Sequence, residues 1–336
     1  MCVLMGCAGD DSPGSGCASC EIKNLEGSCV PNLRGCDDPR PYIGYYGEDP
    51  GVFEPVDASR GVYLDGGSFD VPASSERTQC TYVVLSPEAD FILGRYEARM
   101  SAGSHHFNMM RFDPGTLEAA GIELGVPQDC VNVGVPIYVA GSEWHYVDAP
   151  LSNGLGEKIP AGSGLVMEVH YVNTTAEQLR GRVEVNLFRR DASEVEHYIG
   201  LYFNVMQGFE ISPRSTGTFR ARCPAAEGAN VVLLTSHMHR FGRRFTISLF
   251  DDVAGTNEPL YESLTYDHPV IQQRTDQPLV IGPNQGFEWS CEYENFLDEP
   301  LREGEMGLTN EMCIMVAYYY DERGGLPYCF QPASAF

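Results

Sequence analysis

Short apolar runs separated by turn residues recur along this chain from Val52 onward. They are rich in β-branched and aromatic residues, which favour strands, and no segment keeps a 3.6-residue apolar period for three turns. Many short strands between turns are typical of β-sandwiches and jelly rolls, so the pattern predicts an all-β protein. The predicted strands include Thr81–Leu85, Leu165–Val172, Val183–Phe188, Val231–Leu234, Phe245–Phe250 and Cys313–Tyr320.

The length of the chain and one charged stretch predict how these strands are divided. A chain of 336 residues can form two domains of ordinary size, each with its own core. The charged stretch from Arg189 to Glu194 is the natural boundary between them. We therefore expect a Cys-rich segment over residues 1–50, a first domain over 51–195 and a second domain over 196–336.

Acidic residues outnumber basic residues by 47 to 22, which gives a formal net charge of −25. A field of this sign repels nucleic acid and anionic membranes, so neither is an expected partner. No run approaches the roughly 18 uninterrupted apolar residues of a membrane-spanning helix.

Twelve cysteines point to an oxidising compartment. Residues 4–7, Leu-Met-Gly-Cys, resemble a bacterial lipobox, although only six residues precede Cys7 and none is Lys or Arg. We interpret this N-terminus as a truncated lipoprotein signal with a lipid anchor at Cys7, and the protein as exported to the periplasm or cell surface. The alternative is a tail with an incidental cysteine. Two local disulfides or a small zinc knuckle would both fit the spacing of Cys17, Cys20, Cys29 and Cys36.

Five of the eight histidines and one methionine fall into four short clusters. The first ligand set is His105, His106 and His170, and the second ligand set is His237, His239 and Met312. Imidazole suits copper, zinc, iron and nickel, but a thioether is a soft ligand that favours Cu(I). The residue types therefore predict two copper sites, one from each set.

The local spacing limits how these side chains could converge. His237 and His239 lie two apart, so in a strand both rings share a face while Met238 points away. His105 and His106 are adjacent and need a kink or a strand end, which the small residues before them permit. The alternative for each histidine is an ordinary structural role in the core or on the surface.

The six positions together resemble the copper type II, ascorbate-dependent monooxygenases, the family of peptidylglycine α-hydroxylating and dopamine β-monooxygenases. That family has a His-His pair and a later single His in its first domain, then a His-x-His and a Met within Glu-Met-Cys in its second. Here the matching positions are His105-His106, His170, His237-Met238-His239 and Met312 in Glu311-Met312-Cys313, and the resemblance runs from about Val52 to Phe330.

The resemblance implies two antiparallel β-sandwich domains in tandem with a cleft between them, and two copper ions per chain. It implies that the first ligand set holds an electron-relay copper. His237, His239 and Met312 would be the catalytic residues, holding the copper that binds O2 beside a small organic substrate. Ascorbate or a similar reductant would supply electrons singly, and a C–H bond would be hydroxylated.

The cysteines and two departures refine what the resemblance implies. It implies three disulfides, Cys80–Cys130, Cys223–Cys329 and Cys291–Cys313. Glu168 stands where the family usually has Gln, and Thr235 stands where peptide-hydroxylating members carry an Arg for the substrate carboxylate. A glycine-extended peptide substrate is therefore not implied.

Two other functions fit the same residues. An exported copper-binding or copper-delivery protein would keep the ligands without turnover, and ascorbate-dependent O2 uptake separates it from an enzyme. A zinc hydrolase would need a carboxylate base on a helix beside paired histidines, which the pattern lacks, and Met312 argues against it. We assign His145, His197 and His268 to structure or surface, with a role near the cleft open for His145.

Overall fold

A computed structural model describes residues 53–85, 88–134, 136–173, 175–266, 269–274, 277–321 and 328–335, together with two short strands near the N-terminus. The chain divides into two compact units, Met1–Arg40 and Pro41–Phe336. In the first unit β1 (Glu21–Lys23) pairs antiparallel with β2 (Cys29–Pro31). The predictions of a lipid anchor at Cys7 and of pairing among Cys17, Cys20, Cys29 and Cys36 concern side chains outside the described residues.

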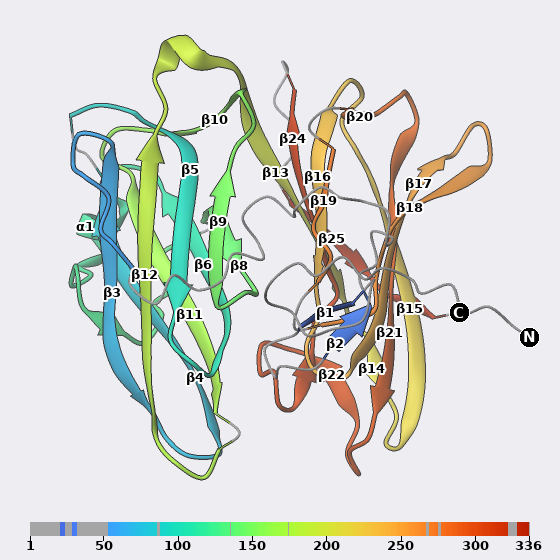
Figure 1. The fold of residues 1–336 in the computed structure, drawn as a ribbon. Helices are drawn as coiled ribbons and strands as arrows, with labels where there is room; N and C mark the ends of the chain where they lie inside the picture. Colours follow the sequence, from blue (N-terminus) through green and yellow to red (C-terminus); the bar gives the residue numbers. More distant parts are fainter. Residues whose placement is uncertain are drawn as a thin grey trace, which may run out of the picture. The chain divides into compact units, whose positions relative to one another are not determined.

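The second unit is an all-β structure, as the strand pattern predicts (Figure 1). Its N-terminal half contains two sheets of antiparallel strands. One sheet is formed by β3 (Gly61–Val71), β12 (Leu179–Arg189), β5 (Phe91–Met100), β9 (Tyr146–Pro150) and β10 (Gly154–Ile159). The other is formed by β7 (Pro127–Gln128), β4 (Ser75–Val84), β11 (Gly164–Asn173), β6 (Ser104–Phe112) and β8 (Ile137–Ser142), with the short helix α1 (Thr116–Ala120) following β6.

The C-terminal half repeats this two-sheet arrangement. The first sheet is formed by β16 (Asn230–His237), β24 (Ile314–Tyr320), β13 (Val195–Gln207), β19 (Gln272–Gln273), β20 (Leu279–Val280) and β25 (Tyr328–Pro332). The second is formed by β18 (Thr256–Ser263), β17 (Gly242–Asp251), β21 (Gln285–Asn295), β15 (Ser215–Pro224) and β26 (Ser334–Ala335). A small third sheet contains β14 (Glu210–Ile211), β22 (Leu301–Glu303) and β23 (Asn310–Glu311).

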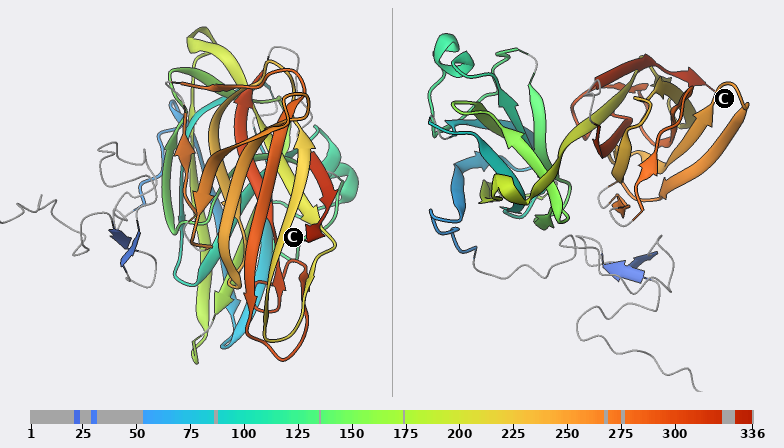
Figure 2. Two further views of the ribbon diagram at one scale, coloured as in Figure 1. Left: turned by 90° about the vertical axis from the view of Figure 1, so that its right-hand side faces the viewer. Right: turned by 90° about the horizontal axis from the view of Figure 1, so that it is seen from above.

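The two halves of the second unit lie side by side as separate groups of strands (Figure 2). Each half buries its own apolar side chains. In the N-terminal half Phe69 on β3 contacts Tyr171 on β11 edge-on, with ring centroids 5.3 Å apart. In the C-terminal half Phe245, Phe287 and Trp289 are fully buried in one cluster. The predicted fold class, tandem β-sandwiches, is therefore confirmed.

A single strand pairing links the two halves among the described strands. β10 pairs in parallel with the start of β13, Gly154 opposite Val195 and Leu155 opposite His197. The charged stretch expected to separate the halves begins at the last residue of β12 and ends in a short 3-10 helix, Ala192–Glu194, that leads into β13. It is anchored by Arg190, whose guanidinium donates to backbone carbonyls of Leu151 and Ser152. The boundary of the two domains near residue 195 stays a prediction.

The three disulfides that the resemblance implied are all formed: Cys80–Cys130, Cys223–Cys329 and Cys291–Cys313. They indicate an oxidising, extracytoplasmic environment. Among the described residues no helix is long and apolar enough to cross a membrane.

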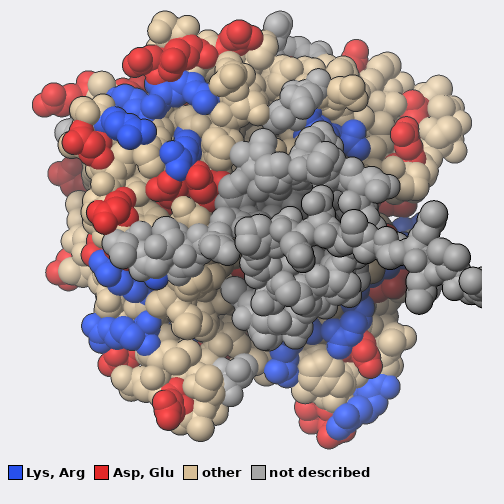
Figure 3. All heavy atoms as spheres, in the orientation of Figure 1, with Lys and Arg blue, Asp and Glu red and all other residues tan. Residues whose placement is uncertain are grey.

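Acidic and basic side chains are interspersed on the face shown in Figure 3. Many of the arginines form exposed ion pairs, such as Arg180 with Asp70 and Arg214 with Asp298, each at 2.8 Å. Exposed pairs of this kind contribute only about 0–1 kcal/mol each to stability. Each pair neutralises a basic side chain. The acidic residues in excess therefore determine the electrostatic field around the molecule, which is negative.

Candidate metal centre

A β-bulge at the start of β6 aims two adjacent histidines at the same place. β6 pairs antiparallel with β11, with His106 opposite His170. The next pair is Ser104 opposite Tyr171, so His105 is an extra residue without an opposite partner. An extra residue bends the strand and redirects its side chain. The kink that adjacent histidine ligands require is thus built into the register of the sheet.

The second pair of histidines is placed by the end of β16. His237 is the last residue of that strand, and His239 follows in the connection to β17. Their ring centroids lie 5.1 Å apart, while the intervening Met238 is buried in the core of the C-terminal half. Only His237 lies within the strand, so regular strand alternation does not place both rings; His239 approaches His237 from the connection that follows.

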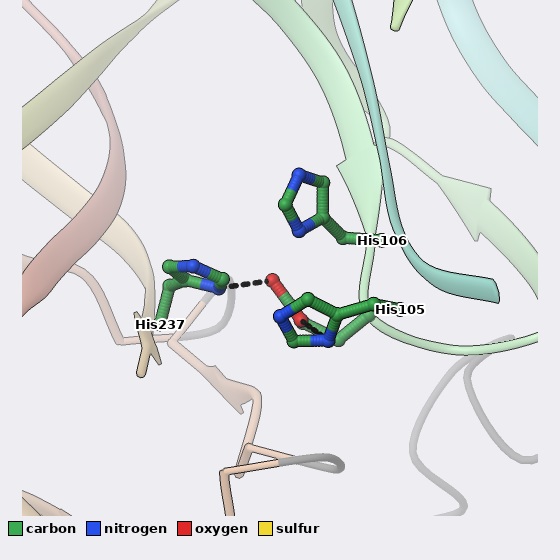
Figure 4. A group of neighbouring side chains, drawn as sticks. His105, His106 and His237 are labelled. Atoms are coloured by element: carbon green, nitrogen blue, oxygen red, sulfur yellow. Dashed lines mark hydrogen bonds and ion pairs between the residues drawn. The ribbon is translucent and has the colours of Figure 1, made fainter. Parts of the chain in front are cut away.

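All five imidazoles come together in one cluster, of which Figure 4 shows His105, His106 and His237. His105 is in contact with both sets, at centroid distances of 4.9 Å to His106, 5.3 Å to His170, 5.6 Å to His237 and 5.3 Å to His239. The sequence predicts two separate sites, whereas the rings of the two ligand sets lie in contact with one another. Which rings would share an ion stays a prediction.

Met312 lies on the wall of a cavity beside these rings. It precedes β24, is partly buried, and packs against Leu201, Ile314 and Val316. Tyr293 donates a hydrogen bond to the Met312 carbonyl at 2.9 Å, and the neighbouring Cys313 is fixed by its disulfide. The cavity of about 280 Å³ is also lined by His106, His170 and His237.

Three carboxylates hold the histidines in place. Glu143 accepts a hydrogen bond from His237 Nδ1 at 2.7 Å, and Glu76 accepts one from His170 Nε2 at 3.0 Å. Glu311 accepts from the backbone N–H of His239 at 2.9 Å and of Phe241 at 2.7 Å. Burial raises the pKa of Glu311 to about 7, against these two bonds, which favour its ionised form.

Several buried atoms in the cluster lack a hydrogen-bond partner among the described residues. They are His105 Nε2, His106 Nδ1, His239 Nε2 and Glu143 Oε2. A buried polar atom without a partner costs about 1–3 kcal/mol, so their convergence calls for an explanation. The donor atoms of His105, His106, His237 and Glu143 lie within 4.8 Å of one another, close enough to share a metal ion.

The protonation states of these rings suit metal binding, which requires neutral imidazole. Burial, reinforced by the neighbouring rings, holds the pKa of His105, His106 and His239 well below the usual value. His239 donates from Nδ1 to the Asn310 carbonyl at 3.1 Å, which leaves its Nε2 free to bind a metal. His237 differs from these three rings. Burial lowers its pKa, but the Glu143 carboxylate has the larger combined effect and raises the pKa above the usual value.

The lining of the cavity combines apolar and acidic residues. The apolar ones include Phe203, Leu233, Ile271, Ile314, Val316 and Tyr318. The acidic ones are Glu143, Glu168 and Glu305, and no Lys or Arg is among the described lining residues. Asn108 Nδ2 donates to Glu168 at 3.2 Å, while burial raises the pKa of this carboxyl. Thr235, where an Arg would bind a substrate carboxylate, donates instead to the Val270 carbonyl at 3.0 Å.

Two of the remaining histidines have contacts elsewhere in the fold. His197 stacks on Tyr320 with centroids 4.3 Å apart, and the His145 carbonyl accepts a hydrogen bond from the Met100 N–H at 2.8 Å. His268 lies outside the described residues. Glu143 was missed in the sequence because a single glutamate in a turn between β8 and β9 carries no spacing signal.

No protein-family model and no curated protein sequence matches this chain. Among solved structures, the major capsid protein of bacteriophage PM2 is similar at 10% identity and a TM-score of 0.34, over 79% of this chain and 99% of that one. The ectodomain of ANX2 from Arabidopsis thaliana is similar at 7% identity and a TM-score of 0.19, over 94% of this chain and 97% of that one. The fold description therefore rests on the strands themselves.

Proposed function

We propose that this protein is a copper-dependent monooxygenase of the ascorbate-dependent type II class, which hydroxylates a C–H bond of a small organic molecule with O2. The observation that carries the proposal is the cluster of five imidazoles, three buried and two partly buried, beside a cavity that is also lined by a thioether. Three of the rings have a nitrogen without a hydrogen-bond partner among the described residues. This donor set fits copper, because imidazole binds both oxidation states and a thioether favours Cu(I).

In this proposal the two ligand sets have different tasks. His105, His106 and His170 would hold an ion that relays an electron, and His237, His239 and Met312 would hold the ion at which O2 is used. When bound, two coppers would each store one electron, so that a one-electron donor such as ascorbate could support a two-electron reduction of O2.

The residues of the chain would prepare this site before any ion binds. Glu76 and the Asn310 carbonyl fix the tautomers of His170 and His239 by accepting their ring N–H bonds. Burial keeps three of the rings neutral and excludes bulk water from the ligand atoms. The apolar residues that line the cavity would hold the hydrocarbon part of a substrate near Met312 and His237, which line the same cavity.

The charge of the cavity favours one class of substrate. Three glutamates and no described Lys or Arg line it, so a cationic or hydrogen-bond-donating head group is favoured over a carboxylate. A small amine with an apolar body fits this combination, whereas a peptide with a free C-terminal carboxylate does not.

The proposal is tested by supplying the copper-loaded protein with ascorbate, candidate amines, small aromatics and peptides under 18O2. The expected result is a product 16 mass units heavier in 16O2 and 18 heavier in 18O2, formed only with copper and ascorbate. A copper-binding or delivery protein, the second candidate, would bind the metal through the same histidines and give no labelled product. The substrate cavity beside the histidines favours the enzyme, because delivery needs no such space.

We also propose that the protein is exported and anchored by a lipid at Cys7. The support is the lipobox-like sequence at residues 4–7 together with the three disulfides. Labelling of the full chain with radioactive palmitate, with Cys7→Ser as the control, tests the anchor. Equal labelling of both chains would contradict it.

A further inference from the structure

Glu143 lies where the two ligand sets meet. It follows β8 in the turn before β9, and β8 pairs with β6 so that Ser142 lies opposite Phe107, the residue after His106. The Ser142 hydroxyl accepts from the Trp144 N–H at 2.8 Å and donates to the Trp144 carbonyl at 2.9 Å. These two hydrogen bonds across the turn hold Glu143 in a fixed position beside the histidine pair.

The two oxygens of Glu143 have different surroundings. Oε1 accepts the hydrogen bond from His237 Nδ1 at 2.7 Å. This bond joins the N-terminal half, which contains Glu143, to the C-terminal half, which contains His237. Oε2 is buried, has no hydrogen-bond partner among the described residues, and lies 3.9 Å from His105 Nδ1 (Figure 4). A buried carboxylate oxygen facing an imidazole without a hydrogen bond is costly unless a cation satisfies it.

The spacing of these atoms fits a shared ion. Imidazole nitrogen and carboxylate oxygen bind such metals at about 2.0–2.2 Å, so two ligands of one ion lie at most about 4.4 Å apart. The 3.9 Å between Glu143 Oε2 and His105 Nδ1 falls inside this limit. The donor atoms of His105, His106 and Glu143 all lie within 4.8 Å of one another, so only small movements would close these three ligands around an ion.

We propose that Glu143 is a metal ligand: its Oε2 atom completes the coordination of the ion held by His105 and His106, while its Oε1 atom orients His237 of the second ligand set. The choice of copper as the ion rests on the proposed function, but the site itself rests on the donor geometry. One carboxylate then connects the two sets, because it binds an ion on one side and a histidine on the other.

The chemistry of the oxygen donor determines what this ligand changes. A carboxylate is a hard, anionic donor and stabilises Cu(II) more than Cu(I), which is the opposite preference to that of the Met312 thioether. Glu143 would therefore make the first ion the more easily oxidised of the two. A more easily oxidised first ion would favour transfer of an electron from the first site to the second, as the proposed function requires.

Glu143→Gln tests the ligand without removing the hydrogen bond to His237. The amide oxygen of Gln still accepts from His237 Nδ1, but the amide nitrogen that replaces Oε2 cannot bind a metal. Glu305→Gln is the matched control. It makes the same change of residue in the lining of the same cavity, but at an exposed side chain. Cu(II) and Cu(I) affinities are measured by competition with chelators specific for each oxidation state, and the Cu(II) site is followed by electron paramagnetic resonance.

The expected result is that Glu143→Gln lowers the Cu(II) affinity of the first site by about tenfold or more, with a smaller loss for Cu(I), and changes the Cu(II) spectrum. Glu305→Gln should bind copper as the wild type does. Equal losses for both oxidation states, or unchanged affinities with an unchanged spectrum, would show that Glu143 only orients His237 and would overturn the proposal.

A second measurement uses the wild-type protein, so that it does not depend on the folding of a variant. Binding of Zn2+ should shift a carboxylate stretching band in the infrared difference spectrum, and the absence of any such shift would also overturn the proposal. Neither measurement depends on turnover. Ligation by Glu143 without hydroxylation would therefore contradict the proposed function alone.

Discussion

At the scale of single residues, one extra position in β6 decides the geometry of the site. Because His105 has no opposite partner on β11, it joins His106 in facing the cluster, although neighbours in a regular strand face opposite ways. The sequence predicted that a kink was needed, since two adjacent histidines could not otherwise share an ion. It did not predict Glu143, because the contact with His237 joins residues 94 positions apart.

Met312→Leu tests the thioether at nearly constant volume. Leu removes the soft ligand, so Cu(I) binding at the second site should weaken and most hydroxylation should be lost, while copper remains at the first site. Copper content and turnover are measured on the same sample. Normal turnover by this variant would show that the Met312 thioether is not required for hydroxylation.

Glu157 on β10 makes the stability depend on pH for a reason unrelated to the metal. It is buried, and burial raises its pKa well above the usual value, with the charge of Arg111 only partly opposing this. The folded-state pKa lies above that of the unfolded chain, so stability is fully present below pH 4.5 and is lost as pH rises through the folded-state pKa. Glu157→Gln should therefore raise the melting temperature at pH 8 and leave it nearly unchanged at pH 4. A stabilisation of equal size at both pH values would contradict the assignment to ionisation.

At the scale of elements, the strands that carry ligands are fixed by contacts at their ends. The segment with Met312 is held by the Cys291–Cys313 disulfide from β21, by the Tyr293 hydroxyl and by the buried Glu311. The apolar runs predicted most of these strands, since alternation and turn residues are local properties. The pairing register, the bulge and the parallel pairing of β10 with β13 were not predictable, because they depend on partners distant in sequence.

Replacement of Cys291 and Cys313 by Ala tests how far the disulfide positions Met312. Loss of a native disulfide typically costs about 2–5 kcal/mol, so the melting temperature should fall. Copper binding at the second site should weaken more than at the first, because Met312 is adjacent to Cys313 and His105 and His106 are not. The Cys80 and Cys130 pair, replaced in the same way, is the control for general destabilisation. An equal effect of both replacements on the second site would contradict this role.

At the scale of the whole molecule, the candidate site joins the two halves of the second unit. Glu143 and His237 meet across them, and Glu76, which holds His170, also accepts the Leu308 N–H at 3.2 Å from the C-terminal half. The sequence assigned the two ligand sets to different domains by their positions in the chain. Their convergence in one cluster could not be predicted, because it depends on how the two sandwiches pack.

Metal binding should therefore stabilise both halves together. An ion present at about 100 times its dissociation constant adds about 2.7 kcal/mol to the folded state. In calorimetry, copper should raise the midpoint temperature of a single cooperative unfolding transition. Glu76→Ala should reduce this increase in temperature. Separate transitions, of which only one responds to copper, would contradict a site shared by the halves.

The most direct test of the central claim is a copper titration of the metal-free protein, with ascorbate-dependent hydroxylation measured at each point. The two ligand sets predict that activity rises until two coppers are bound per chain. His170→Ala should retain copper at the second site but lose the supply of the second electron, and so lose turnover. Full activity with one copper per chain would contradict the account.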